Sequence, residues 1–348
     1  MELSACLGVV SVKRFFLFLP LILLIAGAFS GCAQKEDDET VLVVEGEEIG
    51  RKEFEYQLVS MMSAYEYYNG SPIDWALPIN GMTPEEYFKE QAADSAVLYR
   101  AVRIKGEEMG LGLTEEEEAA IDETISEMIE QAGGEKAFDQ YLESQGLDRS
   151  LYRQVLAGPE AYYKIFQNLY GEGGSLAPTE DLVRDYYQSE YIRTRHIVLY
   201  LTDENGNPLG DEREREQRSR MEAIFTRLQE GEDFGALMTL YNEDLGLNGS
   251  SLCFSYGEMP EDYYQAAISL EPGGFSEIIE LDGLLCIINR LPLEDAFLGE
   301  NYYSIREEYA EFAFNNLLDE WKSELEIKKT PLYNNIDVRA IYSASVKS

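Results

Sequence analysis

Positive charge is scarce in this chain. Lys and Arg together number 28 against 66 Asp and Glu, which gives a formal net charge of −38. A surface of this sign repels a phosphate backbone at every approach, so nucleic acid is excluded as a general partner. Histidine is scarcer still, because His196 is the only one. One histidine without a paired cysteine motif leaves a zinc site without ligands, and we expect neither a metal nor a cofactor.

Long apolar runs are absent except near the start of the chain. Residues 15–29 are apolar or small and follow Lys13-Arg14, and they are too few to span a bilayer comfortably. This pattern is typical of a signal peptide, which we place at 1–31. The sequence Phe29-Ser30-Gly31-Cys32 resembles a bacterial lipobox, which implies a diacylglyceryl group on the Cys32 sulfur and a lipidated tether over 32–40. We therefore expect an extracytoplasmic protein that is lipid-anchored to the bacterial cell membrane; the alternative is an ordinary secretory signal with Cys32 lost or idle.

Cysteine is scarce as well. The chain has four cysteines, of which Cys6 leaves with the signal peptide and Cys32 would carry the lipid. Cys253 and Cys286 remain, and both lie in apolar, strand-like sequence, in which a buried free cysteine behaves as a small hydrophobic residue. A disulfide between these two stays open for an extracytoplasmic protein.

The segment 41–190 has the pattern of a helical domain. Residues 40–49 predict a strand, a glycine turn and the entry to a helix, and apolar spacing predicts that helix over 51–68. The sequence Thr83-Pro84-Glu85-Glu86 supplies a cap, a proline and a glutamate that can reach back to the cap, which start a helix that ends near Met109 with Gly110 as its stop. Thr114 starts the next helix in the same way. We expect a later helix, beginning at Asp148, to be interrupted at Gly158-Pro159, because proline removes a backbone donor.

The segment 191–292 follows a different order. An alternating run at 193–201 predicts a strand that carries His196, a long polar helix follows, and a Leu-Glu-Pro-Gly-Gly turn at 270–274 precedes an apolar strand at 284–288. This succession resembles the parvulin-type (PpiC-like) peptidyl-prolyl isomerase domain. The resemblance implies an antiparallel sheet with surrounding helices and a site for proline-containing peptides.

The resemblance also assigns site residues. Leu252, Met259 and Tyr263 match the positions that form the proline slot, with Tyr263 replacing the usual phenylalanine, so its hydroxyl must find a partner. His196 matches the first of two family histidines and Asp244 matches the acidic position between them. The second histidine position holds Cys286. The catalytic set His196, Asp244 and Cys286 is therefore partly degenerate, which leaves isomerase activity open.

Three other interpretations of these residues are less favoured. Cys286 and His196 could form a nucleophile and base, but a buried strand cysteine without oxyanion donors is typical of packing. The sequence Asp203-Glu204-Asn205-Gly206-Asn207 hints at a calcium loop, although a hairpin turn explains its early glycine better. The alternating arginines and glutamates of 212–220 indicate a solvated helix face.

The whole chain resembles PrsA- and SurA-type extracytoplasmic foldases. Residues 293–348 contain a helical pattern over 298–328 and an alternating run at 336–342, which we expect to form a last strand pairing with the first. The fold class is then α+β: a helical SurA-like chaperone domain at 41–190, an inserted parvulin-like domain at 191–292, and a C-terminal helix and strand at 293–348 that return to the chaperone domain.

The expected function is that of a membrane-anchored extracytoplasmic foldase or chaperone. The partners that the resemblance implies are unfolded or secreted client proteins, and a homodimer is compatible with it. Many of the 24 tyrosines lie in the helical part, where rigid amphipathic rings suit contacts with varied clients. The alternative is a cell-surface structural or partner-binding lipoprotein that uses the fold as a non-catalytic scaffold.

Overall fold

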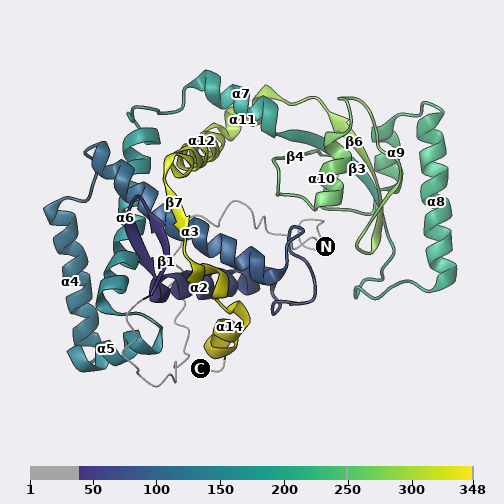
Figure 1. Ribbon diagram of the computed structural model, residues 1–348. Helices are drawn as coiled ribbons and strands as arrows, with labels where there is room; N and C mark the ends of the chain where they lie inside the picture. The colour runs from purple at the N-terminus through teal and green to yellow at the C-terminus, as the bar shows by residue number, and fades with distance from the viewer. Residues whose placement is uncertain (1–38, 248–249, 347–348) are drawn as a thin grey trace. The chain divides into compact units, whose positions relative to one another are not determined.

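The computed structural model describes residues 39–247 and 250–346 (Figure 1). Within these residues the chain divides into two compact units. The sheet unit comprises Pro178–Tyr309, and the helical unit comprises 39–177 together with the residues from Ala310 onward. The predicted signal peptide, the lipobox and Cys32 lie outside the described residues.

The sheet unit is built around one antiparallel sheet of four strands in the order β4-β3-β6-β5. The long central strands are β3 and β6, and His196 of β3 lies opposite Ile288 of β6. In chain order the elements are α7 (Glu180–Glu190), β3 (Ile192–Tyr200), α8 (Asp211–Gln229), α9 (Phe234–Tyr241), β4 (Leu252–Phe254), α10 (Glu261–Ile268), β5 (Ile279–Leu281), β6 (Leu284–Leu291) and α11 (Asp295–Glu300).

Each face of this sheet is covered by different helices, because side chains alternate along a strand. Ile197 and Ile287 point to the face covered by α8 and α9, where they pack on Met221 and Leu237. The other face, which includes Val198 and Cys286, packs on α10 through Tyr263, Tyr264 and Ala267 (Figure 1). The predicted α+β class with an antiparallel sheet is confirmed.

The helical unit contains a small sheet in the order β2-β1-β7 and a set of longer helices. Its α3 begins with the predicted capping box at Thr83 and ends at the predicted stop, where Gly110 has a φ of 70° that favours glycine. In chain order the elements are β1 (Thr40–Val44), β2 (Glu47–Gly50), α2 (Arg51–Asn69), α3 (Pro84–Glu108), α4 (Glu115–Gln131), α5 (Glu135–Ser144), α6 (Arg149–Tyr170), β7 (Ile327–Lys329), α13 (Pro331–Asn335) and α14 (Val338–Val346). The helix α12 (Tyr302–Glu324) begins in the sheet unit and ends in the helical unit.

The predicted last strand at 336–342 is wrong. Residues Val338–Val346 form helix α14, whose first turn is capped by the Asp337 side chain accepting a hydrogen bond from the Ala340 N–H at 2.9 Å. A strand near the C-terminus does pair with β1, but it is β7, in which Lys328 lies opposite Val43. The predicted helix at 298–328 is accordingly divided into α11 and α12, and its last residues belong to β7.

The predicted interruption at Gly158-Pro159 is also wrong, because α6 continues through Pro159. Proline in a helix removes one hydrogen bond, and packing has to offset that loss. Here Gly158 lets the ring of Tyr99 lie directly against the helix, since a Cβ at Gly158 would come within 2.1 Å of that ring. This close packing of α3 against α6 accompanies the continuous helix at Pro159.

The unit boundaries differ from the predicted domain limits of 190/191 and 292/293. Tyr186 and Tyr187 of α7 are buried in one cluster with Tyr191, Leu298 and Ile305. This packing assigns α7, α11 and the start of α12 to the sheet unit. Among residues 39–247 and 250–346, the helices are either too short or too polar to cross a membrane.

Candidate active site

His196 lies on the face of the sheet that α10 covers, and both of its ring nitrogens have a partner. Its Nε2 is 3.0 Å from Asp244 Oδ2, and its Nδ1 is 3.1 Å from the Tyr263 hydroxyl. The same hydroxyl is 2.9 Å from Thr194 Oγ1. The four side chains Asp244, His196, Tyr263 and Thr194 therefore form one continuous hydrogen-bonded network, which we call the buried network.

All members of the buried network are withdrawn from solvent. The exposed fraction is 0% for Thr194, His196 and Tyr263 and 3% for Asp244. A buried polar group is stable only when it is hydrogen-bonded, and here each of the four side chains has at least one such bond. The network is therefore a rigid support whose members lie below the surface.

The loop after α9 places Asp244 against His196. Strand β4 pairs with β3 only from Ile192 to Thr194, so the edge of β3 beyond that point needs other partners. Asn242 Oδ1 accepts the Val198 N–H at 2.9 Å, and the Glu243 N–H donates to the Val198 carbonyl at 2.9 Å. This loop thus continues the edge pairing and fixes the position of the next residue, Asp244.

The carboxylate of Asp244 is held in its charged form. Burial by itself would raise the pKa of Asp244, but the hydrogen bonds from His196 and from the backbone N–H groups of Gly246 and Leu247 outweigh it, and the pKa lies below its ordinary value. Burial raises the pKa of the Tyr263 hydroxyl well above its usual value, so this hydroxyl stays protonated. An ionised carboxylate, an imidazole and a neutral phenol make a stable arrangement of donors and acceptors.

Cys286 lies on the same face of the sheet but outside this network. It is opposite Val198, two residues along β6 from the position opposite His196, and its exposed fraction is 0%. Burial raises the pKa of its thiol, which keeps it protonated and unreactive as a nucleophile. Cys253 and Cys286 are both free, and they lie on strands at opposite edges of β3.

The predicted slot residues lie at one hydrophobic cluster, to which α10 contributes Tyr263. Tyr263 belongs to the buried cluster on this face, and Leu252 and Met259 pack against that cluster while staying partly exposed. The structure therefore brings Leu252, Met259 and Tyr263 together with His196 and Asp244. Their roles in binding and catalysis stay predictions.

Sequence reasoning missed Thr194, Asn242 and Glu243. Thr194 sits two residues before His196, and this period of two was a usable signal that both side chains face α10. The roles of Asn242 and Glu243 depend on where β4 ends, which the sequence does not show. The other predicted loop, at 203–207, is closed by Asp203 Oδ1 accepting the N–H groups of Asn205 and Asn207, and Thr202 bridges to Pro208 across it as in a hairpin turn.

Comparison with known proteins supports the predicted resemblance. Residues 196–290 match the family described as "Rotamase: PPIC-type PPIASE domain". The chain is 26% identical over 257 residues to the foldase protein PrsA of Oceanobacillus iheyensis. This alignment covers 71% of this chain and 77% of that protein. It is 25% identical over 280 residues to the foldase protein PrsA of Caldanaerobacter subterraneus. This second alignment covers 77% of this chain and 79% of that protein.

The chain was also compared with solved structures. The crystal structure of the peptidylprolyl isomerase PrsA from Bacillus cereus is 20% identical, covers 82% of this chain and 90% of its own, and superposes with a TM-score of 0.34. The predicted resemblance to PrsA-type foldases that carry a parvulin-type domain is confirmed.

Proposed function

We propose that this protein is an extracytoplasmic foldase that holds unfolded secreted proteins and catalyses the cis–trans isomerisation of their X–Pro bonds. The observation that carries the proposal is the buried network next to the slot residues Leu252 and Met259, inside a segment that matches the PPIC-type family.

Isomerisation needs a shaped and rigid pocket more than it needs proton transfer. The barrier of about 20 kcal/mol is the loss of amide resonance, and no bond to hydrogen has to break. A slot that excludes water and holds the twisted amide lowers this barrier. Met259 and Leu252 are the partly exposed members of the slot and would contact the substrate, whereas His196 and Asp244 are buried and act as positioning residues.

The Tyr263 hydroxyl compensates for the missing second histidine. The family pattern has a second imidazole at the position of Cys286, and a thiol is a poorer donor and acceptor. In its place, Tyr263 supplies a hydrogen-bond partner to His196 Nδ1 at 3.1 Å and is itself fixed by Thr194 at 2.9 Å. We therefore propose that the site departs from the family pattern but keeps a complete polar network.

Client holding is assigned to the helical unit. Large apolar side chains on this unit stay exposed, among them Tyr67 at 64% and Tyr163 at 62%. Many weak apolar contacts spread over a surface suit unfolded chains of varied sequence. The excess of acidic residues in the chain favours clients that carry positive charge.

An assay of both activities tests this function against a non-catalytic scaffold. The chain from Ala33 onward should suppress aggregation of a reduced, unfolded client and should accelerate isomerisation of a proline-containing peptide. A scaffold lipoprotein would do neither. Aggregation suppression without isomerisation would restrict the proposal to a chaperone and refute the catalytic role of the sheet unit.

The proposal includes a lipid anchor at Cys32, because two acyl chains hold a protein on a membrane where a single chain binds only marginally. Cys32→Ala should release the protein into the medium or block its maturation, as measured by cell fractionation. A variant that is processed and stays membrane-bound like the wild type would contradict the anchor. Sedimentation of the chain from Ala33 onward distinguishes a monomer from the homodimer that the resemblance allows.

A further inference from the structure

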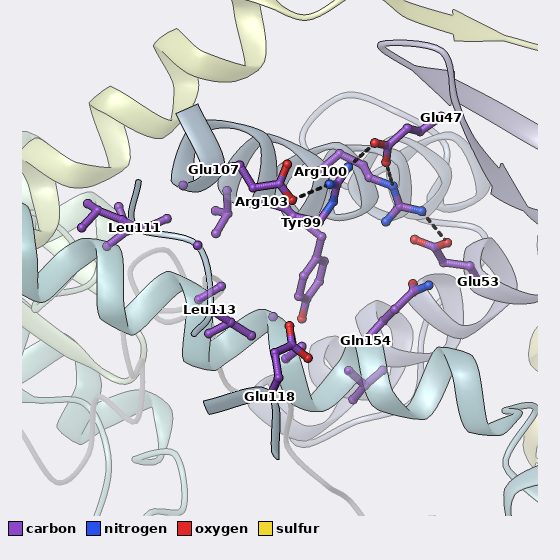
Figure 2. Close-up of a pocket in the computed structure, with 18 of the residues that line it drawn as sticks. Glu47, Glu53, Tyr99, Arg100, Arg103, Glu107, Leu111, Leu113, Glu118 and Gln154 are labelled. Carbon is purple, nitrogen blue, oxygen red and sulfur yellow. Dashed lines mark hydrogen bonds and ion pairs between the residues drawn. The ribbon is translucent and has the colours of Figure 1, made fainter. Parts of the chain in front are cut away.

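The helical unit contains a partly open cavity of about 340 Å³ (Figure 2). Protein interiors contain few voids larger than a water molecule, and sites for small ligands begin at roughly 300 Å³, so this space is large enough to take an occupant. It is lined by residues of β2, α2, α3, α4 and α6 and by the turn between α3 and α4, all within the helical unit.

One part of the wall is apolar and closely packed. Ile165 is fully buried and Leu151 and Val155 are nearly so, and Leu111 and Leu113 of the turn face the same space (Figure 2). Such a wall would cover the aliphatic or aromatic part of an occupant, and each buried methylene group stabilises binding by about 0.8 kcal/mol.

The other part of the wall is charged, with more acids than bases. Arg100 is bonded to Glu53 at 2.9 Å and lies 3.5 Å from Glu47. Arg103 bonds to Glu107 at 2.8 Å and also contacts Glu47, so three carboxylates share two guanidinium groups. Figure 2 shows these ion pairs at one end of the space and a fourth carboxylate, Glu118, near Tyr99 and Gln154.

Glu118 is partly neutralised from outside the cavity by Arg153, at 2.6 Å. Arg153 also lies 3.2 Å from Asp122. The charged groups around the space are then five carboxylates against three guanidinium groups, which leaves two negative charges in excess: Glu47, Glu53, Glu107, Glu118 and Asp122 against Arg100, Arg103 and Arg153. The chain as a whole carries −38, so its field adds to this local excess. A cavity of this kind attracts a cation and repels an anion.

From this geometry we infer that the cavity binds a basic side chain of a client together with an adjacent apolar side chain. The apolar wall covers the apolar residue and the aliphatic stem of the basic one, while the carboxylates receive its charged head. The inference rests on the proposed holding of clients and gives it a location and a sequence preference. It adds a specific subsite to the dispersed surface contacts described above.

Peptide binding to the chain from Ala33 onward tests the inference. The probes are two short, capped, fluorescently labelled peptides that differ at one position, one with a Leu-Lys pair and one with a Leu-Glu pair in a Ser/Gly background. We expect the Leu-Lys peptide to bind at least about tenfold more tightly, because the acidic side chain of the other peptide would lie beside the carboxylates of the cavity. Equal affinities for the two peptides would overturn the inference.

Two variants and their matched controls locate the binding. Ala161→Phe places a ring in the cavity and should abolish binding, whereas Ala120→Phe makes the same change on the exposed face of α4 and should leave it unchanged. Glu118→Gln lowers the negative charge of the cavity wall by one and should reduce the preference for lysine over glutamate, whereas Glu116→Gln, on an exposed position of the same helix, should keep it. Circular dichroism and thermal unfolding establish that each variant is folded.

The outcome also separates this inference from the proposed function. A folded Ala161→Phe variant that binds the Leu-Lys peptide like the wild type would show that the cavity is not the site. Binding of this peptide by a wild-type chain that fails to suppress aggregation would support the cavity and overturn the chaperone proposal. Loss of both peptide binding and aggregation suppression in Ala161→Phe, but not in Ala120→Phe, would support both.

Discussion

The two units of this protein place polar side chains in opposite ways. In the sheet unit, His196, Tyr263 and Asp244 are sealed from solvent at 3% exposure or less and bonded to one another. In the helical unit, Arg100, Arg103 and the carboxylates around them border an open space. A sealed network holds one geometry, which suits a pocket that twists one kind of bond, whereas an open cavity accepts side chains of different shapes. The contrast supports the proposal that the first unit carries out isomerisation and the second selects clients.

Deleting residues 193–291 gives the largest expected effect on this contrast. Arg193 and Leu291 are opposite each other on neighbouring strands, so the cut ends lie close enough to join. We expect isomerisation to disappear while aggregation suppression and cooperative unfolding of the helical unit persist, as measured by activity assays and by circular dichroism. A product with helical signal but no cooperative transition would contradict the independence of the helical unit.

Met259→Ala should reduce isomerisation by about tenfold to a hundredfold. It removes part of the slot wall, and the lost apolar contact with the proline ring amounts to roughly 1.5–3 kcal/mol. Aggregation suppression should not change, because that activity is assigned to the other unit. Met109→Ala, on an exposed methionine of the helical unit, serves as the matched control and should leave isomerisation unchanged. Equal losses in both activities would break the proposed separation.

Asp244→Ala should destabilise the sheet unit by about 1–3 kcal/mol. It leaves His196 Nε2 buried without its partner, and an unsatisfied buried polar atom costs about that much. Chemical unfolding followed by circular dichroism measures the change. Asp282→Ala removes an exposed carboxylate between β5 and β6 and should have almost no effect.

The smallest expected effect is the pH dependence of the contribution that Asp244 makes to the free energy of unfolding. The pKa of Asp244 is lower in the folded protein than its ordinary value of 3.8, so its ionised form stabilises the fold. This contribution is fully present above the ordinary pKa and is lost as the pH falls through the lower, folded value. The stability difference between the wild type and Asp244→Asn should therefore be constant near neutral pH and shrink in acid. A stability difference that grows in acid would contradict a lowered pKa of Asp244 in the folded protein.

Local patterns in the sequence predicted much of the fold. The capping residues Thr83 and Thr114, the alternation around His196 and the turn before β6 each act within a few residues, so their structures follow from short-range chemistry. The run 336–342 also alternates, yet Asp337 caps a helix there, and the strand that pairs with β1 is the polar segment Ile327–Lys329. The pairing of β7 with β1 joins residues far apart in the sequence, and the short exposed strand β7 shows no alternation of apolar and polar residues that would predict it.

The candidate site was predictable only in part. The positions of His196, Asp244 and Met259 followed from motifs that resemble a family. The bond between His196 and Tyr263 joins residues 67 positions apart, and it depends on how α10 packs on the sheet. The sequence showed an extra hydroxyl that needed a partner, but the partner emerged only from the tertiary structure.

The most direct test of the account is isomerisation of a proline-containing peptide by the wild type, Tyr263→Phe, Tyr264→Phe and the double variant Tyr263→Phe/Cys286→His. Removing the Tyr263 hydroxyl leaves His196 Nδ1 and Thr194 without their shared partner, and the loss of about 1.4 kcal/mol corresponds to a tenfold slower reaction. We expect this loss in Tyr263→Phe, no comparable loss in Tyr264→Phe, and partial recovery when an imidazole is restored at position 286. A wild type without catalysis, or a Tyr263→Phe variant as fast as an active wild type, would contradict it.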